Sequence, residues 1–285
     1  MVKIIYEDSE ILVAEKPAGL ESQASRKFEP DMVSEIRNYL VRSQKKRERE
    51  QRRELSTKPS TSLSTPAAAP YVGVIHRLDK PVEGIMVYGL NQKSAASLSA
   101  ALQAGKMEKT YLAVVCGKPV DKQGTYVDYL RHYRENNTSR IVDKSDGNSK
   151  KAVLNYRVLE VINNPGNQEQ MLSLIDIELL TGRHHQIRVQ FAGHDTPLYG
   201  DERYGGGLST KSTTGTVDRG RKRPGFGDRR GALALCARRL VFPHPTTGER
   251  MEFAIVPSSG AFAWFPDRAE KLISGQDCGK CHKEV

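Results

Sequence analysis

The chain has 285 residues, a mass of 31.8 kDa and a formal net charge of +10 at pH 7. That length suits one large domain or two small ones. The four cysteines are too few for a disulfide framework. No apolar run reaches the ~20 residues of a membrane span, and the amino terminus lacks the apolar stretch of a signal peptide. We therefore expect a cytoplasmic protein with a polyanionic partner, nucleic acid first and an anionic membrane surface second.

The first elements are a strand and a helix. Residues 11–19 predict a short strand that closes in a Lys-Pro-Ala-Gly turn. Asp31 is a suitable N-cap for a helix whose apolar positions recur at helical spacing as far as Val41. Beyond it the sequence is helix-compatible but polar, then rich in Ser, Thr, Pro and Ala, so we expect a mobile insert at about 42–70.

Strands predominate afterwards. The apolar runs on either side of residues 76–83 predict strands, and the alternation of 152–162 and 171–180 predicts two long neighbouring strands. The remaining expectations are a helix over 92–104, a strand over 108–117, a turn and helix over 181–193, a second mobile insert over 208–231, and a hairpin over 240–257. Strands and helices intermix without regular alternation, which predicts an α+β fold.

Five stretches carry the strongest signal because they occur in a fixed order. They are Lys16-Pro17-Ala18-Gly19, His76-Arg77-Leu78-Asp79, Lys109-Thr110-Tyr111-Leu112-Ala113, Thr181-Gly182-Arg183-His184-His185-Gln186-Ile187-Arg188, and Gly200-Asp201-Glu202-Arg203-Tyr204-Gly205. Together they resemble the RluA-type RNA pseudouridine synthases, from about residue 4 to about residue 257. The resemblance implies a mixed, mainly antiparallel central sheet with flanking helices and an active-site cleft. It implies a catalytic domain over 1–257, followed by a helix and flexible tail over 258–285.

The resemblance also implies the reaction, which isomerises uridine in structured transfer or ribosomal RNA to pseudouridine. That reaction adds no outside atoms, so no cofactor is expected. Asp79 matches the family's catalytic aspartate, Arg188 the arginine that pairs with it, and Tyr111 the active-site tyrosine. A guanidinium beside a desolvated carboxylate favours its charged form, and an aromatic ring can stack on a flipped uracil.

Each of these residues also has a simpler interpretation. Asp79 could cap a turn, Arg188 could be a solvated helix charge, and Tyr111 could be an aromatic residue packed on the core. The sequence also departs from the family pattern at Glu83, which brings a second negative charge near Asp79.

Other residues are candidates for binding RNA. Arg77 and His76 stand beside Asp79, although His76 could equally be a turn imidazole bonded to backbone, and Arg183 could be structural or bind phosphate. Residues 42–54 hold a net charge of +4 and residues 208–231 a net charge of +5. We therefore expect both inserts to be arms that grip RNA phosphates, the second through Arg219, Arg221, Lys222 and Arg223.

The tail contains Cys278, Cys281 and His282 in a C-x-x-C-H pattern. The pattern fits covalent haem or half a zinc site, but haem attachment requires export and zinc requires more ligands. We therefore expect a flexible tail and no metal.

Two alternatives to a pseudouridine synthase follow from the residues. A non-catalytic RNA-binding or ribosome-assembly protein could keep the same fold, although the presence of Asp79, Tyr111 and Arg188 together argues against it. A hydrolase with an aspartate nucleophile would need a second acid or base close to Asp79, for which His76 is poorly placed. We expect a monomer that binds a stem-loop of transfer or ribosomal RNA and no membrane.

Overall fold

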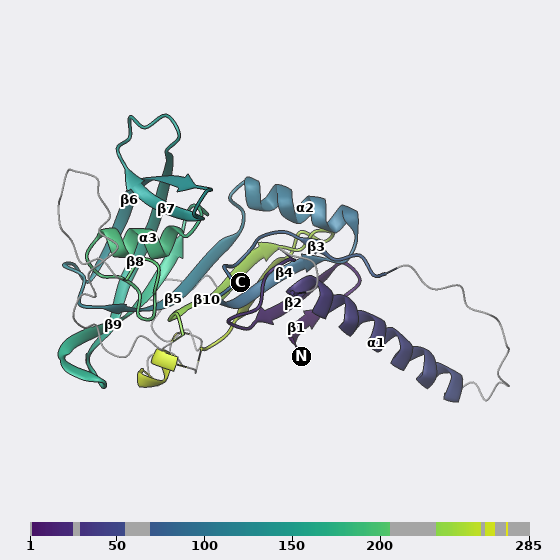
Figure 1. Ribbon diagram of the computed structural model, residues 1–285. Helices are drawn as coiled ribbons and strands as arrows, with labels where there is room; N and C mark the ends of the chain where they lie inside the picture. Colours follow the sequence, from purple (N-terminus) through teal and green to yellow (C-terminus); the bar gives the residue numbers. More distant parts are fainter. Residues whose placement is uncertain are drawn as a thin grey trace, which may run out of the picture. The chain divides into compact units, whose positions relative to one another are not determined.

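A computed structural model describes residues 2–24, 29–54, 69–205, 232–257, 260–265 and 272 (Figure 1). The chain divides into two compact units. Unit 1 comprises Met1–Met107 and Phe242–Met251, and unit 2 comprises Glu108–Val241 and Glu252–Val285.

Unit 1 is built on an antiparallel sheet in the order β1-β2-β4, and the short strand β3 pairs with the carboxyl end of β4. Its central strand buries four successive side chains, from Ile11 to Ala14, so both faces of that strand are covered. The strands are β1 (Lys3–Glu7), β2 (Ile11–Lys16), β3 (Gly73–Val74) and β4 (Glu83–Gly89).

Two helices belong to unit 1, α1 (Met32–Glu54) and α2 (Gln92–Gln103). The predicted N-cap of α1 is confirmed, because the Asp31 carboxylate accepts the Ser34 N–H at 2.9 Å. Helix α2 begins at the N-cap Asn91 and approaches β4 closely. A Cβ atom on Gly89 would lie 2.6 Å from the backbone nitrogen of Ala95, so this approach requires glycine.

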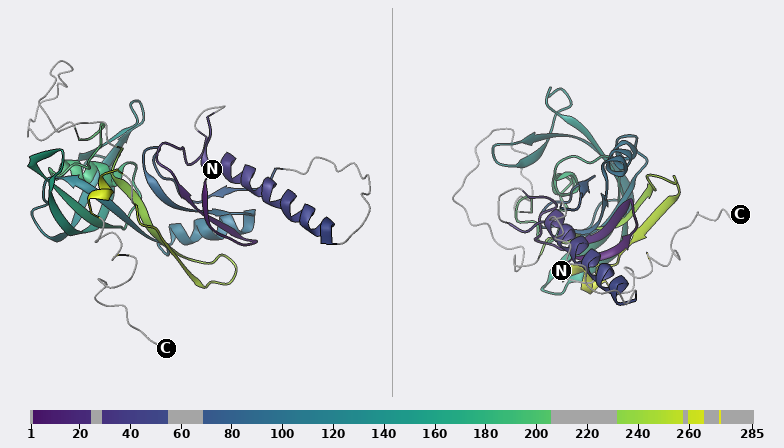
Figure 2. Two further views of the ribbon diagram at one scale, coloured as in Figure 1. Left: turned by 90° about the horizontal axis from the view of Figure 1, so that it is seen from below. Right: turned by 90° about the vertical axis from the view of Figure 1, so that its right-hand side faces the viewer.

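Helix α1 takes up the first part of the insert expected at 42–70. Residues 42–54 continue the helix, as their helix-compatible sequence allowed, because Lys, Arg, Glu and Gln are good helix formers even without an apolar face. The described side chains of this half are mostly exposed, and Figure 2 shows it running beyond the strands of unit 1. Residues 55–68 and 206–231, which hold the rest of the two predicted inserts, lie outside the described residues.

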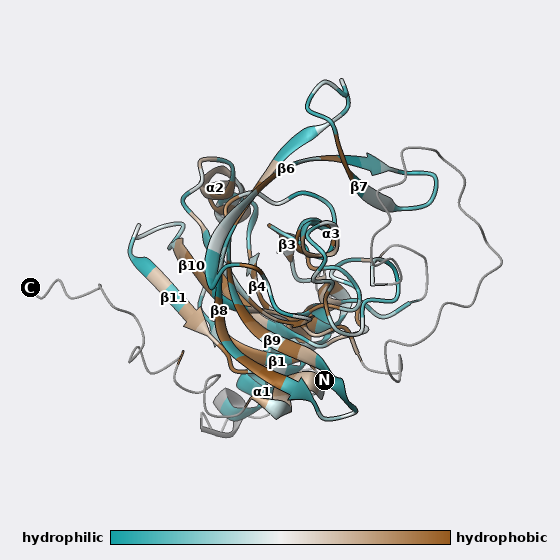
Figure 3. Cartoon of the chain, turned by 90° about the vertical axis from the view of Figure 1, so that its left-hand side faces the viewer, coloured by the Kyte–Doolittle hydropathy of each residue, from teal (hydrophilic) through white to brown (hydrophobic). Residues whose placement is uncertain are grey.

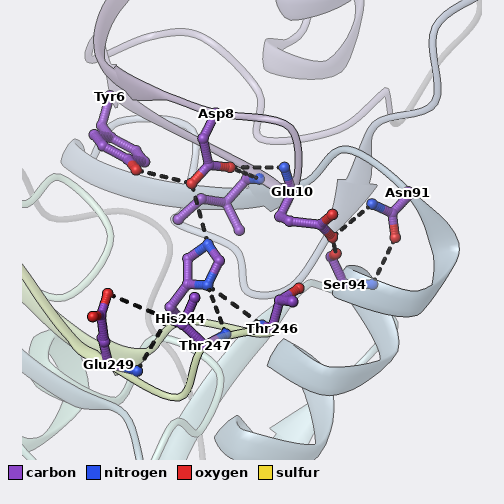
Figure 4. Close-up of polar contacts among 10 residues, drawn as sticks. Tyr6, Asp8, Glu10, Asn91, Ser94, His244, Thr246, Thr247 and Glu249 are labelled. Carbon is purple, nitrogen blue, oxygen red and sulfur yellow. Dashed lines mark hydrogen bonds and ion pairs between the residues drawn. The ribbon is translucent and has the colours of Figure 1, made fainter.

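A polar cluster in unit 1 joins the start of the chain to the turn of the last hairpin (Figure 4). Asp8 accepts the backbone N–H groups of Glu10 and Ile11, each at 2.7 Å, and lies 3.1 Å from His244 Nε2. His244 Nδ1 accepts the Thr247 N–H at 3.1 Å, so the ring proton is on Nε2, which donates a hydrogen bond to Asp8. His244 thereby fixes the turn between β10 (Leu235–Pro243) and β11 (Arg250–Ala254), where a hairpin was predicted.

Unit 2 contains a larger antiparallel sheet in the order β10-β5-β9-β8-β6-β7. The long neighbouring strands predicted at 152–162 and 171–180 are confirmed as β8 and β9. Its remaining strands are β5 (Glu108–Cys116), β6 (Gln123–Tyr133), β7 (Thr138–Val142), β8 (Lys150–Asn164) and β9 (Asn167–Leu179). The α+β class is confirmed, although β1, β6 and β7 were not among the predicted elements.

The core of unit 2 includes a segment that was expected to lie outside the domain. The 3₁₀ helix η1 (Gly260–Trp264) packs on the sheet, where Phe262 and Phe265 are buried beside Leu112 and Leu174. The fold of unit 2 therefore includes residues past 257, and the described part of the helix expected there is the 3₁₀ helix η1.

The opposite face of the unit 2 sheet carries helix α3 (Gln186–Gly193). Ile187 and Phe191 of this helix are buried. In Figure 3 the strands β6 and β7 arch over this helix, and their connecting segments are hydrophilic.

Candidate active site

Asp79 lies in unit 1, in the loop between β3 and β4 where the sequence predicted it. Its carbonyl accepts the Val82 N–H at 2.9 Å, which closes a turn, and the residue is half-buried. The loop itself has no regular structure, so its shape depends on what holds its backbone.

The backbone on both sides of Asp79 is held by the segment that follows β2. Ser22 Oγ donates to the Leu78 carbonyl at 2.6 Å and accepts the Leu78 N–H at 3.0 Å. The Lys80 carbonyl accepts the Lys16 ammonium at 3.1 Å and the Gly19 N–H at 2.8 Å. The residues immediately before and after Asp79 are therefore fixed to the Lys-Pro-Ala-Gly turn, which limits the positions that the Asp79 carboxylate can take.

Lys16 is fully buried, and the sequence indicated only that it shapes a loop. Its ammonium also donates to the carbonyls of Pro17 at 3.0 Å and Leu20 at 2.7 Å. Burial lowers the pKa of Lys16 to about 8, and the nearby carboxylates of Glu21, Asp79 and Glu83 oppose this shift. The Lys16 charge thus partly balances the negative charge that Glu83 brings near Asp79.

The predicted RNA-binding residues that the structure describes have different environments. Arg77 is exposed and forms no ion pair with the described residues, and its contact with RNA stays a prediction. His76 Nε2 accepts the Val87 N–H at 3.4 Å, which supports the alternative that the imidazole serves the turn. Arg183, in unit 2, is exposed and donates from Nε to the Lys151 carbonyl at 2.9 Å, so part of its role is structural.

Tyr111 and Arg188 belong to unit 2. Tyr111 lies on β5, is 7% exposed, and is flanked by Ala237 on β10 and Ile177 on β9. Its burial suits packing on the core as well as stacking on a base. The pairing of Arg188 with Asp79 joins residues of the two units and stays a prediction.

Arg188 is buried on α3 and forms a two-point ion pair with Asp201. Nε and Nη2 of Arg188 each lie 2.8 Å from a carboxylate oxygen of Asp201. Asp201 Oδ1 also accepts the backbone N–H groups of Arg203 at 3.0 Å and Tyr204 at 3.1 Å. Asp201, Arg203 and Tyr204 form a turn, and this turn sets the plane of the Arg188 guanidinium.

The turn predicted at the start of 181–193 includes both histidines. His184 lies outside the helix, because α3 begins at Gln186 and His185 has φ 54°, a left-handed conformation that an α-helix does not continue through. His185 is held there because its Nδ1 lies 2.6 Å from the Tyr204 hydroxyl and its ring is 3.7 Å from that of His184. Burial, with Arg188 and His184 as further causes, lowers the pKa of His185 to about 2, so the imidazole is neutral.

Within the part of the chain that the structure describes, no three His, Cys, Asp or Glu side chains converge as metal ligands would. Cys278, Cys281 and His282 lie outside the described residues, as do Arg219, Arg221, Lys222 and Arg223. None of the described helices combines the length and apolar character needed to cross a membrane.

Comparison with known proteins places the chain among RNA-modifying isomerases. A profile of the family described as RNA pseudouridylate synthase matches residues 10–193. The ribosomal large subunit pseudouridine synthase D of Xanthomonas campestris is 33% identical over 277 residues, which are 96% of this chain and 69% of that protein. The chain therefore belongs to the RNA pseudouridylate synthase family, and the resemblance seen in its five motifs is confirmed.

Two further comparisons define the extent of the similarity. The ribosomal large subunit pseudouridine synthase C of Rickettsia bellii is 30% identical over 71% of this chain, but the match covers only 56% of that protein. The structure of human RNA pseudouridylate synthase domain containing 1 superposes with a TM-score of 0.61 at 21% identity, over 90% of this chain and 84% of that one. This structural likeness supports the fold.

Proposed function

We propose that this chain isomerises uridine in structured RNA, with ribosomal RNA as the first candidate and transfer RNA as the second, and that Asp79 is its catalytic carboxylate. The observation that carries the proposal is the fixation of the backbone on both sides of Asp79 by Lys16, Gly19 and Ser22. A carboxylate that attacks a base needs a fixed position before the substrate arrives, because ordering it during the reaction would cost conformational entropy. The names of the relatives favour ribosomal RNA.

In this proposal the Asp79 carboxylate attacks the ribose or the uracil ring, which releases uracil from its nitrogen linkage. The base turns and rejoins the ribose through carbon 5, and the bond to Asp79 breaks so that the carboxylate is restored. The hydrogen on carbon 5 leaves to solvent, and the freed ring nitrogen takes up a proton. Arg188 would favour the ionised form of Asp79, and Tyr111 would stack on the base or move the proton from carbon 5. No atom is added, so a cofactor is not required. We also propose that the protein acts as a monomer and that it is located in the cytoplasm.

Asp79→Asn tests the proposal because the change preserves size and removes the charge. Deproteinised ribosomal and transfer RNA labelled with tritium at uracil carbon 5 would be incubated with excess enzyme, and tritium release would be measured. We expect loss of nearly all release, with RNA affinity and melting temperature unchanged. Asp121→Asn, at an exposed position, is the matched control and should retain full activity. Release above a few per cent from Asp79→Asn would remove Asp79 from the catalytic role.

The same assay separates the proposal from its alternative. If the unmodified chain binds RNA but releases no tritium from any RNA fraction, the protein is a non-catalytic RNA-binding member of the fold.

A further inference from the structure

The hairpin of β6 and β7 presents two faces with different chemistry. Directly opposed residues of an antiparallel pair point to the same side of the sheet, and successive residues alternate. Leu130 opposes Ile141 and His132 opposes Ser139, so these four share one face. Arg131 opposes Arg140 on the other face, and Tyr133 follows Arg131 on that side.

The first face anchors the hairpin to α3. The Ser139 N–H donates to the Tyr204 hydroxyl at 3.0 Å, and Ser139 Oγ lies 2.9 Å from His184 Nδ1. Ile141 reaches Gly193 so closely that a Cβ atom there would lie 2.3 Å from Ile141 Cδ1. The hairpin is therefore held firmly on the helix that carries Arg188.

The second face gathers positive charge around one aromatic ring. The guanidinium carbon of Arg131 lies 5.0 Å from the centroid of the Tyr133 ring, and that of Arg140 lies 5.5 Å from it. Like charges directly opposite each other on a sheet are unfavourable, and the ring compensates part of that cost through cation–π attraction. A shared ring also restricts the orientation of both guanidinium groups.

Carboxylates of this region neutralise the pair only in part. Arg131 Nη1 lies 2.9 Å from Asp146, which also accepts the Asn148 N–H. Asp143 is engaged by the N–H and hydroxyl of Ser145. Arg140 is exposed and forms no ion pair with any described residue. Residues 129–151 contain six basic and three acidic side chains, so an anion is attracted to this face.

We propose that Arg131 and Arg140, oriented by Tyr133, bind a backbone phosphate of the RNA substrate. The guanidinium group offers planar, paired N–H donors that match phosphate oxygens, and a pre-oriented pair loses little entropy on binding. This inference rests on the proposed function and extends it, because it names an RNA contact that is attached through Ser139 and Tyr204 to the Arg188 helix. The phosphate would set the register of the RNA without reading its sequence.

The cleanest test is Arg140→Ala, since Arg140 has no ion pair to lose among the described residues. The dissociation constant for deproteinised ribosomal RNA would be measured over a series of KCl concentrations, with the Asp79→Asn background used to prevent turnover. We expect Kd to rise about tenfold, as for loss of one charge-assisted contact. The slope of log affinity against log salt should flatten by about 0.7 to 0.9. The double variant Arg131→Ala/Arg140→Ala should weaken binding further, but it should flatten the slope by no more than about 0.9, because both guanidinium groups contact one phosphate.

Two variants separate charge from geometry. Lys118→Ala/Lys122→Ala removes two exposed charges ahead of β6 and serves as the matched control, with Kd expected within about twofold of the parent. Tyr133→Leu keeps both guanidinium charges and removes the ring that orients them. It should raise Kd about threefold while leaving the salt slope unchanged.

The proposal is overturned if Arg140→Ala and the Lys118/Lys122 control have the same Kd and salt slope. It is also overturned if Arg140→Ala lowers the melting temperature while RNA affinity stays at the parental value, because the pair is then structural. The proposed function fails separately, if the unmodified chain shows the Arg140-dependent slope but forms no pseudouridine. If the unmodified chain forms pseudouridine but Arg140→Ala has the Kd and salt slope of the Lys118/Lys122 control, the phosphate site is refuted and the proposed function stands.

Discussion

Asp201→Asn tests whether Arg188 depends on the carboxylate that orients it. The substitution keeps the size of the side chain, and one oxygen remains to accept the N–H groups of Arg203 and Tyr204. The other oxygen, which accepts Arg188 Nε at 2.8 Å, becomes an NH₂ group, so two donors face each other. Flipping the amide only moves that clash to the two backbone N–H groups.

The expected cost is large because the pair is buried. The Asp201 side chain is 0% exposed and that of Arg188 is 7% exposed, so water screens the remaining charge weakly. Removal of one partner from such a pair costs about 3–5 kcal/mol of unfolding free energy. At about 2–4 °C for each kcal/mol, the melting temperature should fall by roughly 6–20 °C.

Thermal melting by circular dichroism measures the stability, and tritium release at a temperature well below both melting points measures the reaction. We expect the variant to be slowed at least about tenfold at saturating enzyme, since in the proposed mechanism the Arg188 guanidinium pairs with Asp79 and a displaced guanidinium would lose that pairing. Asp176→Asn is the matched control, because Asp176 lies 2.9 Å from the buried Arg238 in the same unit. It should lower stability but leave the rate unchanged. A melting temperature within about 2 °C of the unmodified chain, or a rate no lower than that of Asp176→Asn, would refute the role given to Asp201.

Two further outcomes are expected. Folding lowers the pKa of His185 from about 6.5 in the unfolded chain to about 2. The contribution of the neutral imidazole to the free energy of unfolding is therefore fully present above about pH 6.5 and decreases as the pH falls below that value. Between pH 7.5 and 5 this loss is about 2 kcal/mol, and urea unfolding of His185→Gln should show a pH dependence smaller by that amount; an equal dependence would contradict the assignment. Ser22→Ala leaves both backbone groups of Leu78 without their partner, so it should cost about 2 kcal/mol and slow tritium release without changing RNA affinity. Ser99→Ala is its control, and equal rates for the two variants would show that the hydrogen bonds between Ser22 and Leu78 do not position Asp79.

The sequence by itself determined the class of fold and the family. Alternation and helical spacing predicted β8, β9, α2 and the last hairpin. One face of each of these elements is buried, so apolar residues recur along the sequence with the period of a strand or a helix. The five motifs identified the family and located Asp79 in a loop between two strands, since short-range residue order is all that such motifs require. Local patterns did not predict β1, β6 and β7, whose residues are mostly half-buried or exposed.

The tertiary structure decided how the site is held. The partners of Lys16 and Ser22 lie at Leu78 and Lys80, more than fifty residues away, and no spacing rule connects them. The Arg188–Asp201 pair and the left-handed His185 arise because a folded turn brings Asp201 and Tyr204 against the start of α3. The local sequence pattern shows which face of a helix or strand is buried. The partner of a buried charge depends instead on which distant segment of the chain packs beside it in the folded protein.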